Sequence, residues 1–120
     1  MTNNRLNNCT YCMAAHTAES RIQKVPAEVV RALREGTPIA NFKLEALRLF
    51  SIKINQNRGF VDQTDLDAFL AAGYTKANIL EVIVGTGLKV LSNYTNHIAE
   101  TPVDKAFQAD AWSESKSDAA

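Results

Sequence analysis

The sequence of 120 residues has little of several things: two cysteines, three prolines, one tryptophan and no excess of either charge. Its 13 basic residues cancel its 13 acidic ones, and lysine and arginine are not clustered. Nucleic acids and anionic membranes attract proteins through a positive field, so this balance argues against both as the main partner. Small molecules and other protein chains remain as the expected partners.

Long apolar segments are also missing. No uncharged apolar run approaches the roughly 20 residues of a membrane span, and residues 1–5 lack the apolar core of a signal peptide. Cys9 and Cys12 would close too short a loop for a structural disulfide, because such a bond stabilises mainly by restricting a longer loop. A reducing compartment fits two such cysteines, and we expect a cytoplasmic protein.

What is present is typical of one soluble domain. Hydrophobic residues make up 46% and charged residues 22% of the chain, which suits a globular protein with one core. We expect a single helical domain over residues 1–112, with Trp112 as its last anchor. Residues 113–120 are small and polar, and we expect a flexible C-terminal tail there.

Apolar residues recur at helical spacing through most of the chain, which predicts an all-α fold with about five main helices. Pro26 and Gly36 mark the start and stop of one helix, Asp62 or Thr64 can cap another, and Thr75 can cap the longest. The expected helices cover 6–24, 27–35, an apolar pattern at 44–54, 62–72 and 75–99, with one or two further turns over 103–109.

The expected helix 75–99 is the most apolar. Glu81 and Lys89 are the only charges among its residues between 79 and 91, which predicts burial on most sides. Gly85 and Gly87 would each cost about 1 kcal/mol relative to alanine. A close approach of a second helix is the expected compensation.

Residues 8–16, Asn-Cys-Thr-Tyr-Cys-Met-Ala-Ala-His, hold both cysteines and one of the two histidines. If they are helical, Cys9, Cys12 and His16 stand at i, i+3 and i+7, on one face. A helix start favours a thiolate, and a nearby imidazole can take or relay its proton. Cys12 is then the better placed nucleophile, and Cys9 would resolve its oxidised form into a disulfide that an external dithiol reduces. This chemistry needs no cofactor and no metal.

The two cysteines admit three other interpretations. Haem attachment is excluded by Met13, because a histidine must follow the second cysteine directly. Structural zinc would need Cys9, Cys12, His16 and the distant His97, a set without a familiar spacing. Incidental cysteines are the third. His97 itself is either a second proton carrier or, more simply, a surface histidine near a helix end.

Residues 8–16 resemble the Cys-x-x-Cys-x-x-x-His signature of the alkyl hydroperoxidase D-like proteins, in the carboxymuconolactone decarboxylase superfamily. Later segments that resemble the family's order of helices and turns are 47–51, 59–62, 71–75, 79–82, Asn93 and 102–104. The resemblance implies an all-helical bundle that forms trimers or hexamers. It also implies that Cys12 attacks the peroxide, with Cys9 as its partner and His16 as the relay.

The family's relay glutamate and the helices before its motif would fall ahead of Met1, so the resemblance implies a member without the usual N-terminal helices. Glu19 follows the motif and is not an equivalent of that glutamate. The decarboxylase branch lacks the cysteine pair, which disfavours lactone decarboxylation.

Two functions follow as predictions. The first is a thiol-based peroxidase or disulfide oxidoreductase, an antioxidant enzyme that uses Cys9, Cys12 and His16 and is reduced by an external dithiol. The alternative is a non-catalytic helical oligomerisation module whose dithiol is a redox sensor or a vestige.

Overall fold

The computed structural model describes residues 1–114, and within them the chain is helical and has no strand. Its elements are α1 (Thr2–Leu6), α2 (Thr10–Ile22), α3 (Ala27–Glu35), α4 (Phe42–Gln56), α5 (Gln63–Ala71), α6 (Lys76–Ile98) and the short 3-10 helix η1 (Lys105–Asp110). Five of these helices are long enough to build the domain. The prediction of an all-α fold with about five main helices is confirmed.

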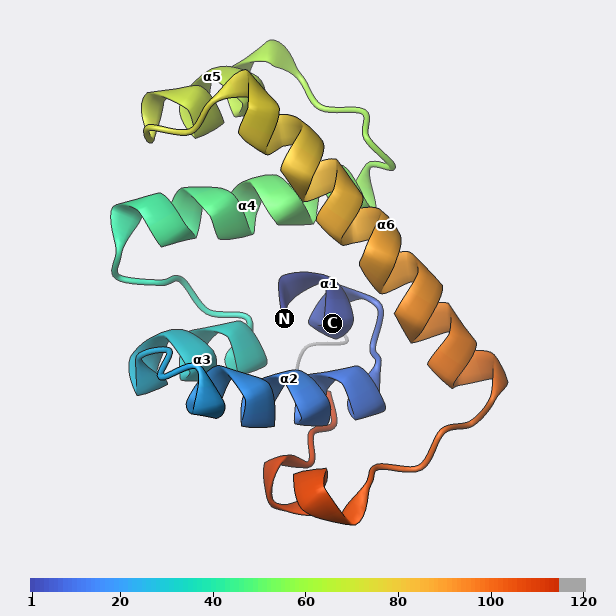
Figure 1. Cartoon of the computed structure of the whole chain (residues 1–120). Coiled ribbons are helices and arrows are strands. Elements are labelled where there is room, and N and C mark those ends of the chain that lie inside the picture. Colours follow the sequence, from blue (N-terminus) through green and yellow to red (C-terminus); the bar gives the residue numbers. More distant parts are fainter. Residues whose placement is uncertain (115–120) are drawn as a thin grey trace.

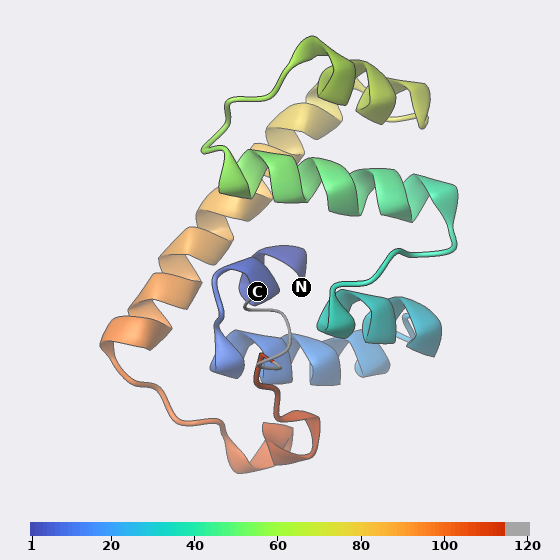
Figure 2. The ribbon, with the colours of Figure 1, turned by 180° about the vertical axis from the view of Figure 1, so that it is seen from behind.

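The short helix α1 lies at the centre of the domain (Figure 1). Helices α2 and α3 lie on one side of it and α4 on the other, while α6 runs across all of these layers, as the view from behind also shows (Figure 2). α1 contacts α2, α3, α4 and α6. The first residues of the chain therefore connect elements that are far apart in the sequence.

The predicted helix starts and stops at α3, α5 and α6 are confirmed. Pro26 precedes α3, and Gly36 ends it in the left-handed conformation at φ 75°. The Asp62 carboxylate accepts a hydrogen bond from the Asp65 backbone N–H at 2.9 Å. At α6, Thr75 and Asn78 form a reciprocal capping box. Each signal is local, because the side chain satisfies backbone donors of the adjacent turn.

The predicted first helix over 6–24 is wrong at its start. The chain forms α1, leaves the helical conformation, and begins α2 only at Thr10. Asn8 adopts a positive φ of 52°, and Cys9 is extended at φ −88° and ψ 98°. Asparagine tolerates the left-handed region better than most residues, so it can break a helix without glycine or proline. Cys9 is consequently the N-cap of α2 rather than part of its first turns.

The apolar core has two parts. Val29, Ala32 and Ile39 form one cluster beside α3. The other joins α4 and α5 through Phe50, Ile54 and Phe69. In this second cluster the rings of Phe50 and Phe69 stack at 4.2 Å, and Tyr74 stacks on Phe69 at 4.4 Å.

Helix α6 is not buried on most sides, which corrects the prediction. Its one fully buried residue is Asn93. A Cβ atom added at Gly85 or Gly87 would meet nothing within 4 Å, so the expected close helix is absent from residues 1–114. The rest of the domain covers one side of α6 only. Large apolar side chains stand exposed on it: Leu80, Ile83, Val84, Leu88, Leu91, Tyr94 and Ile98.

The last described segment returns to α2 and α3. The Tyr11 hydroxyl donates to Asp104 Oδ2 at 2.9 Å, and its ring packs edge-on against Phe107. Trp112 Nε1 donates to the Arg34 carbonyl at 3.0 Å, so Trp112 is the anchor that the sequence predicted. Of the predicted tail, residues 115–120 lie outside the described residues. In the part of the chain that is described, no helix is long and apolar enough to span a membrane.

Candidate functional site

The two cysteines lie together where α2 begins. Cys9 closes α1 by donating its backbone N–H to the Asn4 carbonyl at 2.9 Å. Its sulfur then accepts the backbone N–H of Cys12 at 3.4 Å and so caps the next helix. Because the chain turns at Asn8, Cys9 can both end α1 and cap α2. The sequence predicted that Cys9 and Cys12 share a site, and they lie close.

Both thiols are free and nearly closed off from solvent, with 1% of Cys9 and 4% of Cys12 exposed. Asn96 Nδ2 donates to Cys12 Sγ at 3.2 Å. The pKa of Cys9 is raised to about 11, because burial disfavours its thiolate and its side chain hydrogen-bonds to Cys12; a hydrogen bond with Asn93 acts in the opposite direction. Cys9 therefore remains a thiol at neutral pH.

A cluster of asparagines surrounds the thiols. Asn93 Nδ2 donates to Asn4 Oδ1 at 3.0 Å, and Asn7 Nδ2 donates to Asn93 Oδ1 at 2.9 Å. Asn4 Nδ2 in turn donates to the Cys12 carbonyl at 3.3 Å. Asn4 and Asn93 are fully buried. Buried amides of this kind need their partners, so the network fixes α1 against α6 and α2.

His16 lies on α2, C-terminal to Cys12, and both of its ring nitrogens have partners. Nδ1 lies 3.1 Å from the Glu19 carboxylate, and Nε2 lies 2.6 Å from Lys89 Nζ. Burial and then the positive charge of Lys89 lower the pKa of His16, while Glu19 raises it. The ring is thus neutral at pH 7, with Nδ1 donating to Glu19 and Nε2 accepting from Lys89.

Sequence reasoning found Cys9, Cys12 and His16 but missed their partners. Glu19 was not predicted to contact His16, although its i, i+3 spacing from that histidine on a helix indicates such a contact. Lys89 and Asn96 lie 73 and 84 positions from the residues they contact, a separation that no local pattern reveals.

The four residues of the zinc alternative are not gathered. In residues 1–114 there is no group of three or more histidine, cysteine, aspartate or glutamate side chains that could hold a metal ion. His97 is exposed near the end of α6, beside the ring of Tyr94. Its surface position fits the simpler of its two interpretations.

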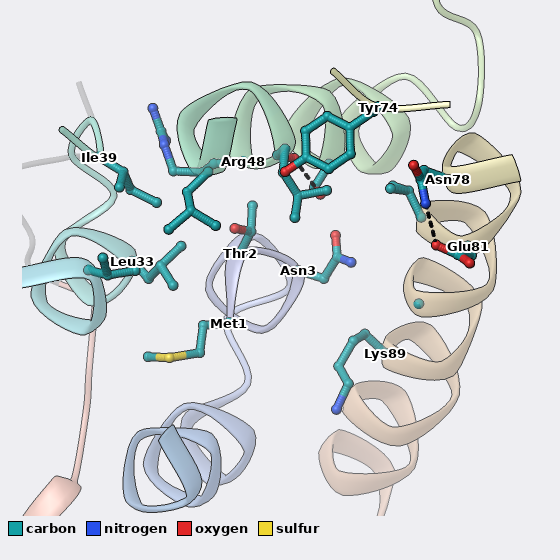
Figure 3. Close-up of a pocket in the computed structure, with 16 residues that line it drawn as sticks. Met1, Thr2, Asn3, Leu33, Ile39, Arg48, Tyr74, Asn78, Glu81 and Lys89 are labelled. Carbon is teal, nitrogen blue, oxygen red and sulfur yellow. Dashed lines mark hydrogen bonds between the residues drawn. The ribbon is translucent and has the colours of Figure 1, made fainter. Parts of the chain in front are cut away.

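A cavity of about 500 Å³ lies between α1, α3, α4 and α6, and Lys89, which contacts His16, is part of its lining. Figure 3 shows Lys89 and Glu81 projecting from α6, with Met1 and the α1 residues Thr2 and Asn3 on the inner side. Neither cysteine lines the cavity. Lys89 is therefore shared between the cavity and the histidine of the dithiol site.

Comparison with known proteins adds no family to these observations. No model of a known protein family matches the sequence. A search of curated proteins likewise gave no match. The resemblance to the alkyl hydroperoxidase D-like proteins thus stays a prediction from the motif, and what is established is an all-helical domain with two adjacent free cysteines.

Proposed function

We propose that this protein is a dithiol oxidoreductase that reduces hydroperoxides, or exchanges disulfides, through Cys9 and Cys12. The observation that carries the proposal is the meeting of two free thiols at one helix start, with the Cys12 N–H on Cys9 Sγ. A pair held this close can form a disulfide with little movement of the backbone. A reducing, cytoplasmic location belongs to the proposal, because the pair must be returned to the dithiol form.

The proposed reaction has three balanced steps. The Cys12 thiolate attacks the terminal oxygen of a hydroperoxide, the O–O bond breaks, and the alcohol leaves after taking a proton, which gives a sulfenic acid on Cys12. The Cys9 sulfur then attacks the Cys12 sulfur, releasing water and forming the disulfide. An external dithiol reduces this disulfide by two thiol exchanges and is itself oxidised.

The assignment of roles rests on the contrast between the sulfurs. Cys9, with its pKa near 11, is suited to wait as a thiol and resolve the intermediate. Cys12 Sγ accepts a hydrogen bond from Asn96 Nδ2, which holds this sulfur in place. Cys12 also lies in the first turn of α2, where the helix dipole favours a negative charge.

His16 is the proton carrier in this proposal. Its neutral ring can accept a proton at Nε2, in exchange for the hydrogen bond that this nitrogen accepts from the Lys89 ammonium group. Glu19 holds the ring in one tautomer and stabilises the imidazolium that forms. No hydrogen bond joins His16 to either sulfur in residues 1–114, so proton transfer needs a water or a small motion of the ring.

The test is a titration of free thiols during incubation with hydrogen peroxide or cumene hydroperoxide. We expect the wild-type protein to lose both of its thiols. Cys12→Ser should lose none, and Cys9→Ser should stop at a sulfenic acid that a dimedone probe labels. Unchanged peroxide consumption by Cys12→Ser would end the proposal.

A second function is favoured by the exposed apolar face of α6, which suits a helical module that assembles with copies of itself. Oligomerisation, as a trimer or hexamer, also belongs to the first proposal, so assembly alone does not separate the two. Turnover of peroxide distinguishes the two functions. A purely structural module would oligomerise but consume no peroxide with any dithiol donor.

A further inference from the structure

The cavity beside Lys89 has the size and lining of a small-molecule site. Its volume of about 500 Å³ falls within the range of roughly 300–1,000 Å³ that is usual for ligand pockets. Apolar side chains from three directions make up most of its wall: Val29 and Leu33 of α3, Leu44 and Leu47 of α4, and Val82 of α6. Such walls fit an aliphatic chain.

The charged side chains of the cavity differ in whether a partner within the protein already occupies them. Arg48 is already held by the Glu45 carboxylate through two contacts, at 2.7 and 2.8 Å. Glu81 accepts from Asn78 Nδ2 at 2.7 Å. Lys89 lies two turns further along α6, about 12 Å from Glu81 along the axis at 1.5 Å per residue. The two charges therefore mark different ends of the cavity.

Lys89, by contrast, is a cation of the cavity that has no anion beside it in residues 1–114. Its Nζ contacts the neutral ring of His16, and no carboxylate among residues 1–114 lies within ion-pair distance of it. Its side chain is half-buried beside the apolar walls. A partly buried ammonium group gains more from a carboxylate than from an imidazole, because a charged acceptor roughly doubles the strength of a hydrogen bond.

We propose that this cavity binds an aliphatic carboxylate, with its chain among the apolar walls and its carboxylate on Lys89 Nζ. The proposal rests on the cavity and on Lys89, and it does not require the dithiol chemistry. It does have a consequence for that site. A bound carboxylate draws Lys89 away from His16 and removes the positive charge that opposes protonation of the ring.

The test is calorimetric titration with sodium decanoate and, as a probe with the same tail and the opposite charge, decyltrimethylammonium bromide. We expect decanoate to bind at least tenfold more tightly. Lys89→Met should weaken decanoate binding about tenfold, as expected for loss of a charged hydrogen bond, and leave the ammonium probe unaffected. Equal affinity for the two head groups in the wild type would overturn the proposal.

Two glycines of α6 supply a matched pair of variants. Gly85 lines the cavity and Gly87 does not, although an added Cβ atom meets nothing within 4 Å at either position. We expect Gly85→Leu to fill the cavity and abolish decanoate binding, and Gly87→Leu to retain it. Loss of decanoate binding in Gly87→Leu alone, or an equal loss in both variants, would show that the ligand binds elsewhere.

The dithiol supplies a last control. Cys12→Ser should bind decanoate as the wild type does, since neither cysteine lines the cavity. Failure of peroxide consumption therefore leaves the cavity proposal intact, and failure of decanoate binding leaves the dithiol proposal intact. Loss of decanoate binding in Cys12→Ser would contradict a site that is independent of the thiols.

Discussion

At the scale of single residues, His16 is the side chain whose partners most restrict its chemistry. It lies between a carboxylate, Glu19, and an ammonium group, Lys89. The α-amino group of Met1 is also close enough to act on the ring through its charge. Burial and Lys89 together lower the pKa of His16, so its protonation in the folded state requires a lower pH than in the unfolded chain.

This pKa shift predicts how stability depends on pH. Between the lowered pKa and the ordinary value near 6.5, the unfolded chain binds more protons at His16 than the folded one, so stability falls as pH falls. The Met1 amine, lowered to about 6 by burial and by Lys89, acts in the same direction between pH 8 and 6. We therefore expect the urea midpoint to fall from pH 8 to pH 5.5, above the range in which Glu45 titrates.

Lys89→Met should make the fall in the urea midpoint smaller. The pKa values of His16 and of the Met1 amine both rise toward their ordinary values when the lysine charge is removed. His97→Gln is the control and should retain the wild-type pH dependence, since His97 is exposed and remote from this cluster. The account of His16 is wrong if Lys89→Met unfolds with the same pH dependence as the wild type.

At the scale of elements, Asn93 connects the start of the chain to its longest helix. Its amide bonds to Asn4 and Asn7, and its side chain is fully buried. A second hydrogen bond joins α1 and α6, in which Asn3 Nδ2 donates to Thr86 Oγ1 at 3.3 Å. Helix α1 has only five residues and cannot be stable alone, so these bonds hold it in place.

We expect Asn93→Ala to lower the free energy of unfolding by about 2–4 kcal/mol, because it leaves the buried Asn4 Oδ1 and the partly buried Asn7 Nδ2 without their partner. Urea denaturation measures this. Thr95→Ala, an exposed change on the same helix, should stay within about 0.5 kcal/mol of the wild type. A loss at Asn93 no larger than the loss at Thr95 would show that the asparagine network has no role in holding α1.

The helices from α3 to α6 could be predicted because their ends are marked by side chains that act within one turn, such as Thr75 and Gly36. The break between α1 and α2 could not, since Asn8 reaches a positive φ that its sequence context does not demand. Cys9, Cys12 and His16 could be predicted because they lie close together in the sequence at helical spacing. Lys89, Asn93 and Asn96 reach that site through the packing of α6, which a local pattern does not contain.

At the scale of the whole molecule, the apolar face of α6 is the largest departure from what the sequence predicts for one chain. Apolar content alone shows that a helix needs cover, and it does not show whether the same chain supplies it. Leu88 is 59% exposed and Leu91 69% exposed, and Gly87 lies about one turn before Leu91 on the same helix. A small residue at the centre of an apolar stripe permits close approach of another helix.

We expect the protein to be oligomeric at micromolar concentration, and the double variant Leu88→Lys with Leu91→Lys to be monomeric by light scattering coupled to size exclusion. Both side chains are already largely exposed, so helical content by circular dichroism should not change. Ile22→Lys, at an equally exposed site on α2, should leave the oligomer intact. A wild-type protein that is monomeric at all concentrations would refute assembly through α6.

The sulfur of Cys9 is the cap of α2 as well as one half of the dithiol. If disulfide formation in the proposed chemistry draws this atom away from the Cys12 N–H, the capping bond belongs to the reduced state. An interaction that exists only in the reduced state makes the pair a stronger oxidant, by about 30 mV for each 1.4 kcal/mol in a two-electron couple. The way α2 begins would thereby contribute to the reduction potential of the proposed dithiol couple.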